Sequence, residues 1–236
     1  GLSSETQSDN VSSVDKDKEI YDLQQMIEIS KSLCSVIEYS KLVEAVLFNC
    51  MCQMRVTGAC IFIQSFDSDV FSLEDNYTGI ETLDSIQYKI SENHPILKFL
   101  NKKNQAFTLG ELNSTFTEGE IPIQITSLNP TLIVPLQHQN RINGILLLGE
   151  RIDLGEGIEY TDYDRKQILS IAALSSIAIN NATLVEMTTT DMMTHLKLKH
   201  YFYKVLTEKL DFSIVNKLPL SVLMLDIDFF KKFNDT

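Results

Sequence analysis

Hydrophobic positions recur with two different periods along the first half of the chain. In residues 20–34 and 42–54 they are spaced three or four apart, as on one face of a helix. After Gly58 the apolar and polar residues alternate instead, which is typical of strands. Three strands are predicted, at residues 59–66, 70–77 and 85–90.

The second half of the chain begins with short elements and ends in one long helix. We expect a short helix at residues 94–100, a brief strand at 105–109, a polar loop at 110–122, and an apolar hairpin formed by 131–136 and 142–149. Thr161 then opens the long helix as its N-cap, with carboxylates in the first turn. Neither Gly nor Pro interrupts this helix before residue 186.

Small and aliphatic residues form a stripe along the long helix. The stripe consists of Ile168, Ala172, Ser175, Ile179 and Ala182. A second set, formed by Ile171, Ala178 and Val185, repeats every seven residues, which is the period of a coiled coil. Helical packing within the same domain is the alternative, but the helix is longer than one domain core requires. We therefore expect a parallel homodimer through the helix at residues 161–190.

The order of elements predicts an α+β fold, with an antiparallel sheet and helices on one of its faces. Residues 1–17 are rich in Ser, Asp and Gln, and we expect a disordered leader there. Residues 191–236 hold seven lysines and six acidic residues, whereas the whole chain has a net charge of −12. This shift in charge favours a boundary near residue 190. The expected parts are the leader, a domain at 18–160, the helix at 161–190 and a second domain from 191.

Composition narrows the classes of function. The net charge of −12 disfavours nucleic acids and anionic membranes as partners, because both require basic patches on the protein. We identify no apolar run as long as a membrane span and no signal pattern at the N-terminus. The four cysteines are typical of reduced thiols rather than of a metal site or disulfides. We therefore expect a cytoplasmic location.

The clearest candidate chemistry lies near the C-terminus. The segment PLSVLMLDID, residues 219–228, is apolar on both faces and predicts a central strand that ends in acids. Asp226 and Asp228 are two residues apart, so they share one face of that strand. Carboxylates in such a place can hold Mg²⁺ against a nucleotide phosphate, and the backbone amides of residues 229–231 can help. A solvated strand edge is the alternative.

Two segments of the C-terminal region carry a family resemblance. LDIDFFKKFND resembles the first substrate-binding segment of the GGDEF diguanylate cyclases, approximately L-D-I-D-x-F-K-x-I-N-D. DMMTHLKLKHYF resembles their opening motif, D-x-L-T-G-L-x-N-R-R-x-F, with His195 in place of the Gly and residues 198–200 in place of N-R-R. The resemblance implies a GTP site and a bound Mg²⁺. It assigns Asp226 and the Ile227 carbonyl to the metal, Phe229, Phe230 and Lys231 to the phosphates, and Asn234 to guanine.

In that family, two GTP-loaded domains meet and condense their substrates into cyclic di-GMP. The GG[D/E]EF loop that gives the family its name does not occur in these 236 residues. We therefore expect this chain alone to be catalytically incompetent, as the regulatory region and the first part of a diguanylate cyclase. A degenerate GGDEF domain that only senses GTP is the alternative.

Residues 20–186 resemble a GAF domain in the order of their elements. The run from Ile27 to Ile63 is similar to that family's two-helix opening and first strand, and IAINNATLVEM is similar to its usual exit helix. GAF domains bind cyclic nucleotides, haem, bilins or other small molecules, and some bind nothing. No cysteine lies in residues 89–136 for a bilin, and His94 and His138 are better explained as a helix-start residue and a solvated turn residue than as haem ligands.

A cyclic nucleotide, cyclic AMP or cyclic GMP, is the expected sensor ligand. Asn101, Lys102, Phe107 and Glu111 partly match the Asn-Lys, Phe and Asp-Glu pattern of cyclic-nucleotide GAF domains, although Leu112 departs from it. The candidate binding residues offer stacking rings and neutral hydrogen-bonding groups. They are Ser91, Asn93, Phe99, Phe107, Asn113, Ser114, Thr115, Phe116 and Thr117. A ligand-free dimerisation scaffold is the alternative.

Overall fold

The chain divides into two compact units, unit 1 at Gly1–Glu186 and unit 2 at Met187–Thr236, which are described separately. The computed structural model describes residues 5–36, 38–65, 68–117, 119–155, 157–191, 193–194 and 196–229. The boundary between the units falls inside a long helix, α6.

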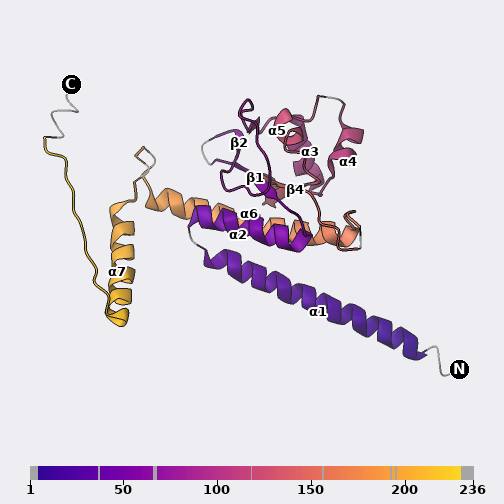
Figure 1. Cartoon of the computed structure of the whole chain (residues 1–236), viewed down its shortest axis with the longest axis horizontal. Helices are drawn as coiled ribbons and strands as arrows, with labels where there is room; N and C mark the ends of the chain where they lie inside the picture. Colours follow the sequence, from indigo (N-terminus) through magenta and orange to yellow (C-terminus); the bar gives the residue numbers. More distant parts are fainter. Residues whose placement is uncertain are drawn as a thin grey trace. The chain divides into compact units, whose positions relative to one another are not determined.

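Unit 1 is a five-stranded antiparallel sheet with helices packed on it (Figure 1). Its elements, in chain order, are α1 Glu5–Ser35, α2 Tyr39–Met54, β1 Ala59–Gln64, β2 Val70–Leu73, β3 Lys89–Ser91, α3 Pro95–Lys103, α4 Leu109–Thr115, α5 Ile123–Thr126, β4 Leu132–His138, β5 Arg141–Leu148 and α6 Asp162–Thr189. The expected α+β class and the antiparallel sheet are confirmed.

The strand order is β3-β2-β1-β5-β4, so β1 lies at the centre of the sheet. Phe62 of β1 is opposite Leu73 of β2 on one side and Ile145 of β5 on the other. The hairpin between β4 and β5 turns at Gln139 and Asn140, whose φ angles of 48° and 62° are typical of a two-residue β-turn. This hairpin is the one that the apolar pattern predicts.

Helices cover both faces of the sheet, where the sequence pattern predicted one. Alternate residues of β1 point to opposite sides, because side chains alternate along a strand. Ile61 and Ile63 pack with apolar residues of α1, α2 and α6, whereas Cys60 and Phe62 pack with those of α3, α4 and α5. Of this second layer, α3 matches the helix expected at residues 94–100, whereas α4 lies mostly in the segment 110–122 expected to be a polar loop, and no element was predicted where α5 forms.

Three elements of unit 1 differ from expectation, and local hydrogen bonds account for one of them, α4. Thr108 and Glu111 form a capping box at the start of α4, which gives this short Thr-rich segment a helical start despite its polar sequence. The helix α1 begins at Glu5, so it covers most of the segment 1–17 that was expected to be disordered. The third strand, β3, is also shorter than the predicted segment 85–90 and begins at Lys89.

The helix α6 supplies a large part of the core of unit 1. By length and composition it could cross a membrane, and it is the one helix among the described residues that passes this test. Its buried residues, however, pack with α2 and with β1, β4 and β5. Burial in the core of unit 1 is therefore sufficient to explain its apolar composition.

Unit 2 contains the helix α7, Lys199–Asn216, which follows a short turn. The structure describes all of α7, and none of its residues is buried. The segment 218–228, predicted to be a central strand, is extended coil and is exposed. A central strand requires neighbours for its hydrogen bonds, and the described part of unit 2 contains no strand beyond a single bridge between Thr190 and Lys197.

Candidate functional site

Three of the expected sensor residues are aromatic, and they come together between α3 and α4. The ring of Phe99 lies 5.2 Å from the ring of Phe107 and 5.2 Å from that of Phe116, measured between centroids. All three side chains are half-buried against the core on this face of the sheet. The sequence therefore identified a real cluster, but in this structure its rings contact one another and contribute to packing.

The expected polar residues of α4 take part in its own hydrogen bonds. The hydroxyl groups of Ser114 and Thr115 donate to the carbonyl oxygen of Glu111, at 2.7 and 3.2 Å. Asn113 lies exposed on the same short helix. These residues lie near the aromatic cluster in sequence, but the hydroxyl groups serve the helix in the described structure.

The remaining polar candidates stabilise turns on either side of these helices. The backbone N–H of Thr117 donates to the carboxylate of Glu120 at 2.6 Å. The backbone N–H of Asn93 donates to the hydroxyl oxygen of Ser91 at 3.3 Å. Both are local contacts within exposed segments, and they leave the ligand role of these residues a prediction.

A cavity of about 530 Å³ lies where α4 approaches the start of α6. Its lining residues are Gln105, Ala106, Phe107, Glu111, Tyr160, Asp162, Arg165 and Leu169. Phe107 is the expected sensor residue in this lining. Positively and negatively charged side chains both line the cavity, and its volume falls within the range of small-molecule sites.

Arg165 connects this cavity to the long helix. From the first turn of α6, its guanidinium donates to both carboxylate oxygens of Glu111, at 2.9 and 3.0 Å, and to the carbonyl oxygen of Ala106 at 2.7 Å. Partial burial alone would raise the pKa of Glu111. Hydrogen bonds from Arg165 and Thr108, together with the charge of Arg165, outweigh that effect and hold the pKa below its usual value. We call this contact the Arg165–Glu111 pair.

A second arginine fixes the start of α6 to the end of the sheet. Arg151 is buried, and it donates to Asp164 at 3.0 Å and to the carbonyl oxygen of Glu159. Its guanidinium also lies 4.5 Å from the centre of the Tyr160 ring. Asp164 and Thr161 complete a reciprocal cap, in which each backbone N–H donates to the side chain of the other residue. The first turn of α6 is thus held by Arg151, by Arg165 and by the cap between Thr161 and Asp164.

The middle of α6 is joined to β5 by a reciprocal pair of polar contacts. The hydroxyl of Ser176 donates to the side-chain oxygen of Asn143 at 2.7 Å, and the Asn143 amide donates to the carbonyl of Ser176 at 3.1 Å. Sequence reasoning missed these contacts, and also Arg151 and Arg165. The capping pattern at Thr161 was a visible signal, but Glu111 lies 54 residues before its partner Arg165.

The predicted dimer seam on α6 is wrong in its residues. Ile168, Ala172, Ser175, Ile179 and Ala182 are at most 5% exposed, because they face the core of their own chain. Ile171 and Ala178 are buried as well, whereas Val185, the third residue of the seven-residue repeat, is 40% exposed. The structure therefore has the alternative arrangement, in which α6 packs within its own domain.

A polar cluster lies at the opposite end of β5. Arg141 and Gln64 both donate to the same carboxylate oxygen of Glu92, at 2.8 Å in each case. Next to them, the side-chain oxygen of Asn101 accepts from the backbone N–H of Ile142 at 2.8 Å. These residues line a cavity of about 140 Å³. Asn101, which matched the cyclic-nucleotide pattern, therefore joins α3 to β5.

In unit 2, the opening motif forms a compact turn. The Asp191 carboxylate accepts from the backbone N–H of Thr194 at 2.8 Å and from its hydroxyl at 2.8 Å. Lys197 donates to Thr190 at 2.7 Å. The Asp and Thr that match the family motif therefore stabilise the connection between α6 and α7. His195 lies outside the described residues.

The residues expected to hold GTP and metal are not assembled into a site. Asp226, Ile227 and Phe229 lie in exposed coil, and Phe230, Lys231 and Asn234 lie outside the described residues. Within the described ranges, no group of three or more His, Cys, Asp or Glu side chains is placed to hold a metal ion. The described residues therefore do not by themselves form a Mg²⁺ site, and the assignment of these residues stays a prediction.

Comparison with known proteins gives matches for both units of the chain. The family model described as "Diguanylate cyclase, GGDEF domain" matches residues 188–236. Diguanylate cyclase A from Treponema denticola is 45% identical over 225 residues, which is 94% of this chain and 60% of that protein. The chain thus spans less than two thirds of the relative's length.

Solved structures resemble unit 1 in fold. The GAF domain of an Acinetobacter phosphoenolpyruvate-protein phosphotransferase aligns with 69% of this chain and 95% of its own, at a TM-score of 0.51 and 12% identity. The GAF domain of the corresponding enzyme from Coxiella burnetii aligns with 70% of this chain and 95% of its own, at a TM-score of 0.50 and 11% identity. Unit 1 therefore has a GAF-like fold, and residues 188–236 after it match the GGDEF domain model.

Proposed function

We propose that this chain is the regulatory region and the first part of the catalytic domain of a diguanylate cyclase that makes cyclic di-GMP from two GTP. The 45% identity to diguanylate cyclase A over almost the whole chain carries this proposal. The GGDEF match at residues 188–236 supports it from the catalytic side. GTP and Mg²⁺ are the substrate and metal that the proposal requires, and the cytoplasm is the location we assign to it.

Asp226 is the residue on which the catalytic part of the proposal is tested. In the complete protein that contains this chain, Asp226→Ala should abolish cyclic di-GMP synthesis by removing a metal ligand. Asp211→Ala is the matched control, because Asp211 is an exposed acid on α7 with no match to the substrate motif. A fully active Asp226→Ala protein would show that the metal-ligand role implied by the family resemblance does not apply to Asp226.

The regulatory part of the proposal concerns α6. This helix runs without interruption from the core of unit 1 to Thr189, one residue before the bridge that precedes α7. A change of packing in unit 1 would therefore alter the position or rotation of the helix that leads to the cyclase domain. We propose that unit 1 sets the geometry of a homodimer in this way, because two GTP-loaded domains must meet.

A cyclic nucleotide in unit 1 is the second candidate function, and the cavity beside Phe107 and Arg165 favours it. A cyclic phosphate carries one negative charge, and it would compete with Glu111 for the guanidinium of Arg165. Binding would then loosen the connection between α4 and α6.

The test of this candidate is thermal stabilisation and calorimetry with cyclic AMP and cyclic GMP. Heat of binding that Arg165→Ala abolishes would support it, and Lys166→Ala, on the next and exposed position of α6, is the control. No heat and no stabilisation at millimolar ligand would leave the ligand-free scaffold as the function of unit 1.

A further inference from the structure

We infer that the outward face of α1 pairs in parallel with the same face of a second copy of this chain. This face, called the α1 outer stripe, consists of Ile20, Leu23, Ile27, Ser30 and Cys34. The inference deepens the homodimer of the proposed function by naming its interface, and it rests on that proposal only for its consequence, the pairing of two cyclase domains.

The helix α1 has two apolar faces, and one of them is used within its own chain. Ile29 and Leu33 are buried in the core of unit 1, and Met26 packs against them. On the other side of the helix, Ile20 and Ile27 are each 53% exposed and Leu23 is 60% exposed. Large apolar residues in a row on the outside of a helix are typical of an interaction surface.

The spacing of the outer stripe indicates what kind of partner it fits. Its residues follow one another at intervals of three, four, three and four, which places them at the a and d positions of a heptad. Ile20 and Ile27 then occupy a positions and Leu23 a d position. β-Branched residues at a with Leu at d favour two parallel helices, so the stripe is self-complementary.

Charge permits a second copy at this face. The whole chain carries −12, which opposes self-association, and an uncharged contact surface keeps the local part of this repulsion small. The outer stripe contains no acidic residue. Of the neighbouring acids whose side chains the structure describes, Asp22 accepts from the Tyr163 hydroxyl at 2.6 Å, and Glu28 pairs with Lys31 beside the stripe. Glu19 precedes Ile20 in the sequence, and its side chain lies outside the described ones.

The direction of the pairing matches the direction of the regulatory helix. Tyr163, near the start of α6, bonds to Asp22 of α1, and both helices lead away from that contact in the same direction (Figure 1). A parallel α1 pair therefore brings the C-terminal ends of both α6 helices to the same end of the dimer.

Cys34 allows this register to be tested directly. It is exposed and occupies an a position, so in a parallel pair it lies opposite Cys34 of the second copy at a separation that a disulfide can span. In an antiparallel pair it would lie opposite the other end of the stripe. Cys52 is also exposed but lies on α2, and Cys50 and Cys60 are buried.

The experiment is oxidation of residues 1–236 with copper phenanthroline in air, which removes two protons and two electrons from a pair of thiols. We expect a disulfide-linked dimer that persists in Cys52→Ser and disappears in Cys34→Ser. A linked dimer in Cys34→Ser, an absence of linkage in a chain that light scattering shows to be dimeric, or a monomer at micromolar concentration would overturn the inference.

Variants of the stripe give a second readout. Leu23→Glu should weaken dimerisation at least tenfold with little change in helical content, whereas Ser32→Glu, an exposed site on α1 outside the stripe, should not. Cyclic di-GMP synthesis by the complete protein is measured separately. A Cys34-linked protein that makes no cyclic di-GMP contradicts the proposed function alone, and an active protein that is monomeric or paired elsewhere contradicts this inference alone.

Discussion

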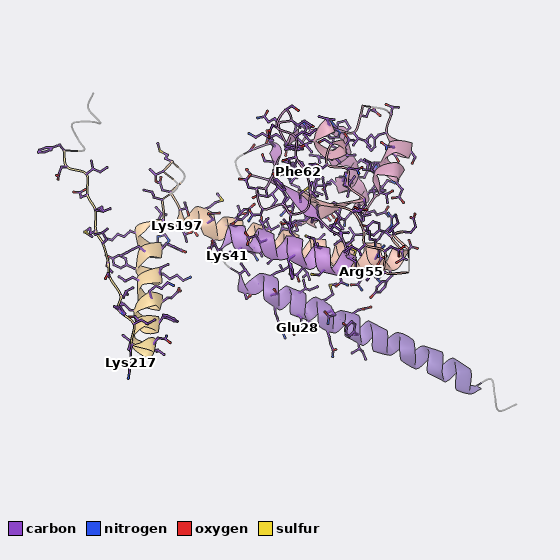
Figure 2. The ribbon with its side chains drawn as sticks, in the orientation of Figure 1. Glu28, Lys41, Arg55, Phe62, Lys197 and Lys217 are labelled. Atoms are coloured by element: carbon purple, nitrogen blue, oxygen red, sulfur yellow. The ribbon has the colours of Figure 1, made fainter. Side chains whose placement is uncertain are left out.

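The two units contain the same kind of apolar segment, and only one of them is a strand. In unit 1, β1 lies between β2 and β5, and Phe62 at its centre is completely buried (Figure 2). In unit 2, the segment 218–228 is as apolar, yet Leu223 is 81% and Met224 92% exposed. The difference shows that an apolar run becomes a strand only where other strands satisfy its backbone.

Among the described residues, regular helices form in both units, whereas the named strands form only in unit 1. The helix α7 has 18 residues without a buried side chain, because its hydrogen bonds are made within the helix itself. The helix α6, by contrast, is fixed by buried side chains and by Arg151, Arg165 and Ser176. Helical structure alone therefore says little about which segments carry the stability of this chain.

The largest expected effect concerns the two apolar segments. Phe62→Ala should lower the free energy of unfolding by about 4 kcal/mol, since it opens a cavity in the centre of unit 1. Leu223→Ala should change it by less than about 0.5 kcal/mol, since that side chain is already exposed. Denaturant unfolding of residues 1–236 measures both values. Equal losses would mean that Leu223 is buried in solution and that the contrast between the units does not hold.

The next effect separates the inner and outer faces of α6. Ile179→Lys places a charge in the core of unit 1 and should lower the free energy of unfolding by about 3 kcal/mol. Ile177→Lys, two residues earlier and on the exposed face, should leave the unfolding temperature nearly unchanged. Calorimetry measures the unfolding temperature of each variant. If Ile179→Lys is as stable as the original chain, the buried face of α6 does not belong to the core of unit 1.

A smaller effect is expected for the Arg165–Glu111 pair. A double-mutant cycle with Arg165→Ala and Glu111→Ala should give a coupling of about 1 kcal/mol, because the pair is bidentate and partly shielded from solvent. The exposed pair between Lys41 and Glu38 is the control, and its coupling should be clearly smaller, because solvent screens both charges. A coupling as low as that of the control would show that the Arg165–Glu111 pair does not connect α4 to α6 energetically.

The smallest effect is the dependence of stability on pH. The pKa values of Glu111 and Asp164 are held below their usual values by their hydrogen bonds and by Arg165 and Arg151, which outweigh the opposing effect of burial. Their contribution is therefore complete above the unfolded pKa values of about 4 and is lost as the pH falls through the lower folded values. Glu111→Gln should reduce the loss of stability between about pH 5 and pH 3. An unchanged profile would contradict the assigned pKa direction.

The sequence predicted those features that depend on neighbouring residues. The hairpin of β4 and β5, the helices α2 and α6, and the cap at Thr161 all follow from patterns within a few residues. The resemblance to a GAF domain, confirmed in fold, rested on the order of these elements. Phe99, Phe107 and Phe116 were grouped as candidate ligand-binding residues by the GAF resemblance. The structure brings their rings together, and their ligand role stays a prediction.

The sequence could not predict which face of a helix its own chain would cover. The stripe of small and aliphatic residues on α6 is compatible with a seam between two chains and with the core of one chain. Only the position of the sheet determines which of the two it forms. In the same way, Arg165 and Glu111 are ordinary charged residues until the fold places their charged groups about 3 Å apart. Contacts between residues far apart in the chain set both outcomes.

The central claim is that α6 passes a structural change from unit 1 to the cyclase domain, and its rotational phase tests that claim most directly. In the complete protein, one alanine inserted between Glu186 and Met187 rotates the following residues by about 100°, whereas seven alanines restore the phase to within about 20°. We predict that one alanine changes the rate of cyclic di-GMP synthesis at least about tenfold and that seven return it to within about twofold of the original. Original activity in the protein with a single inserted alanine would contradict the account.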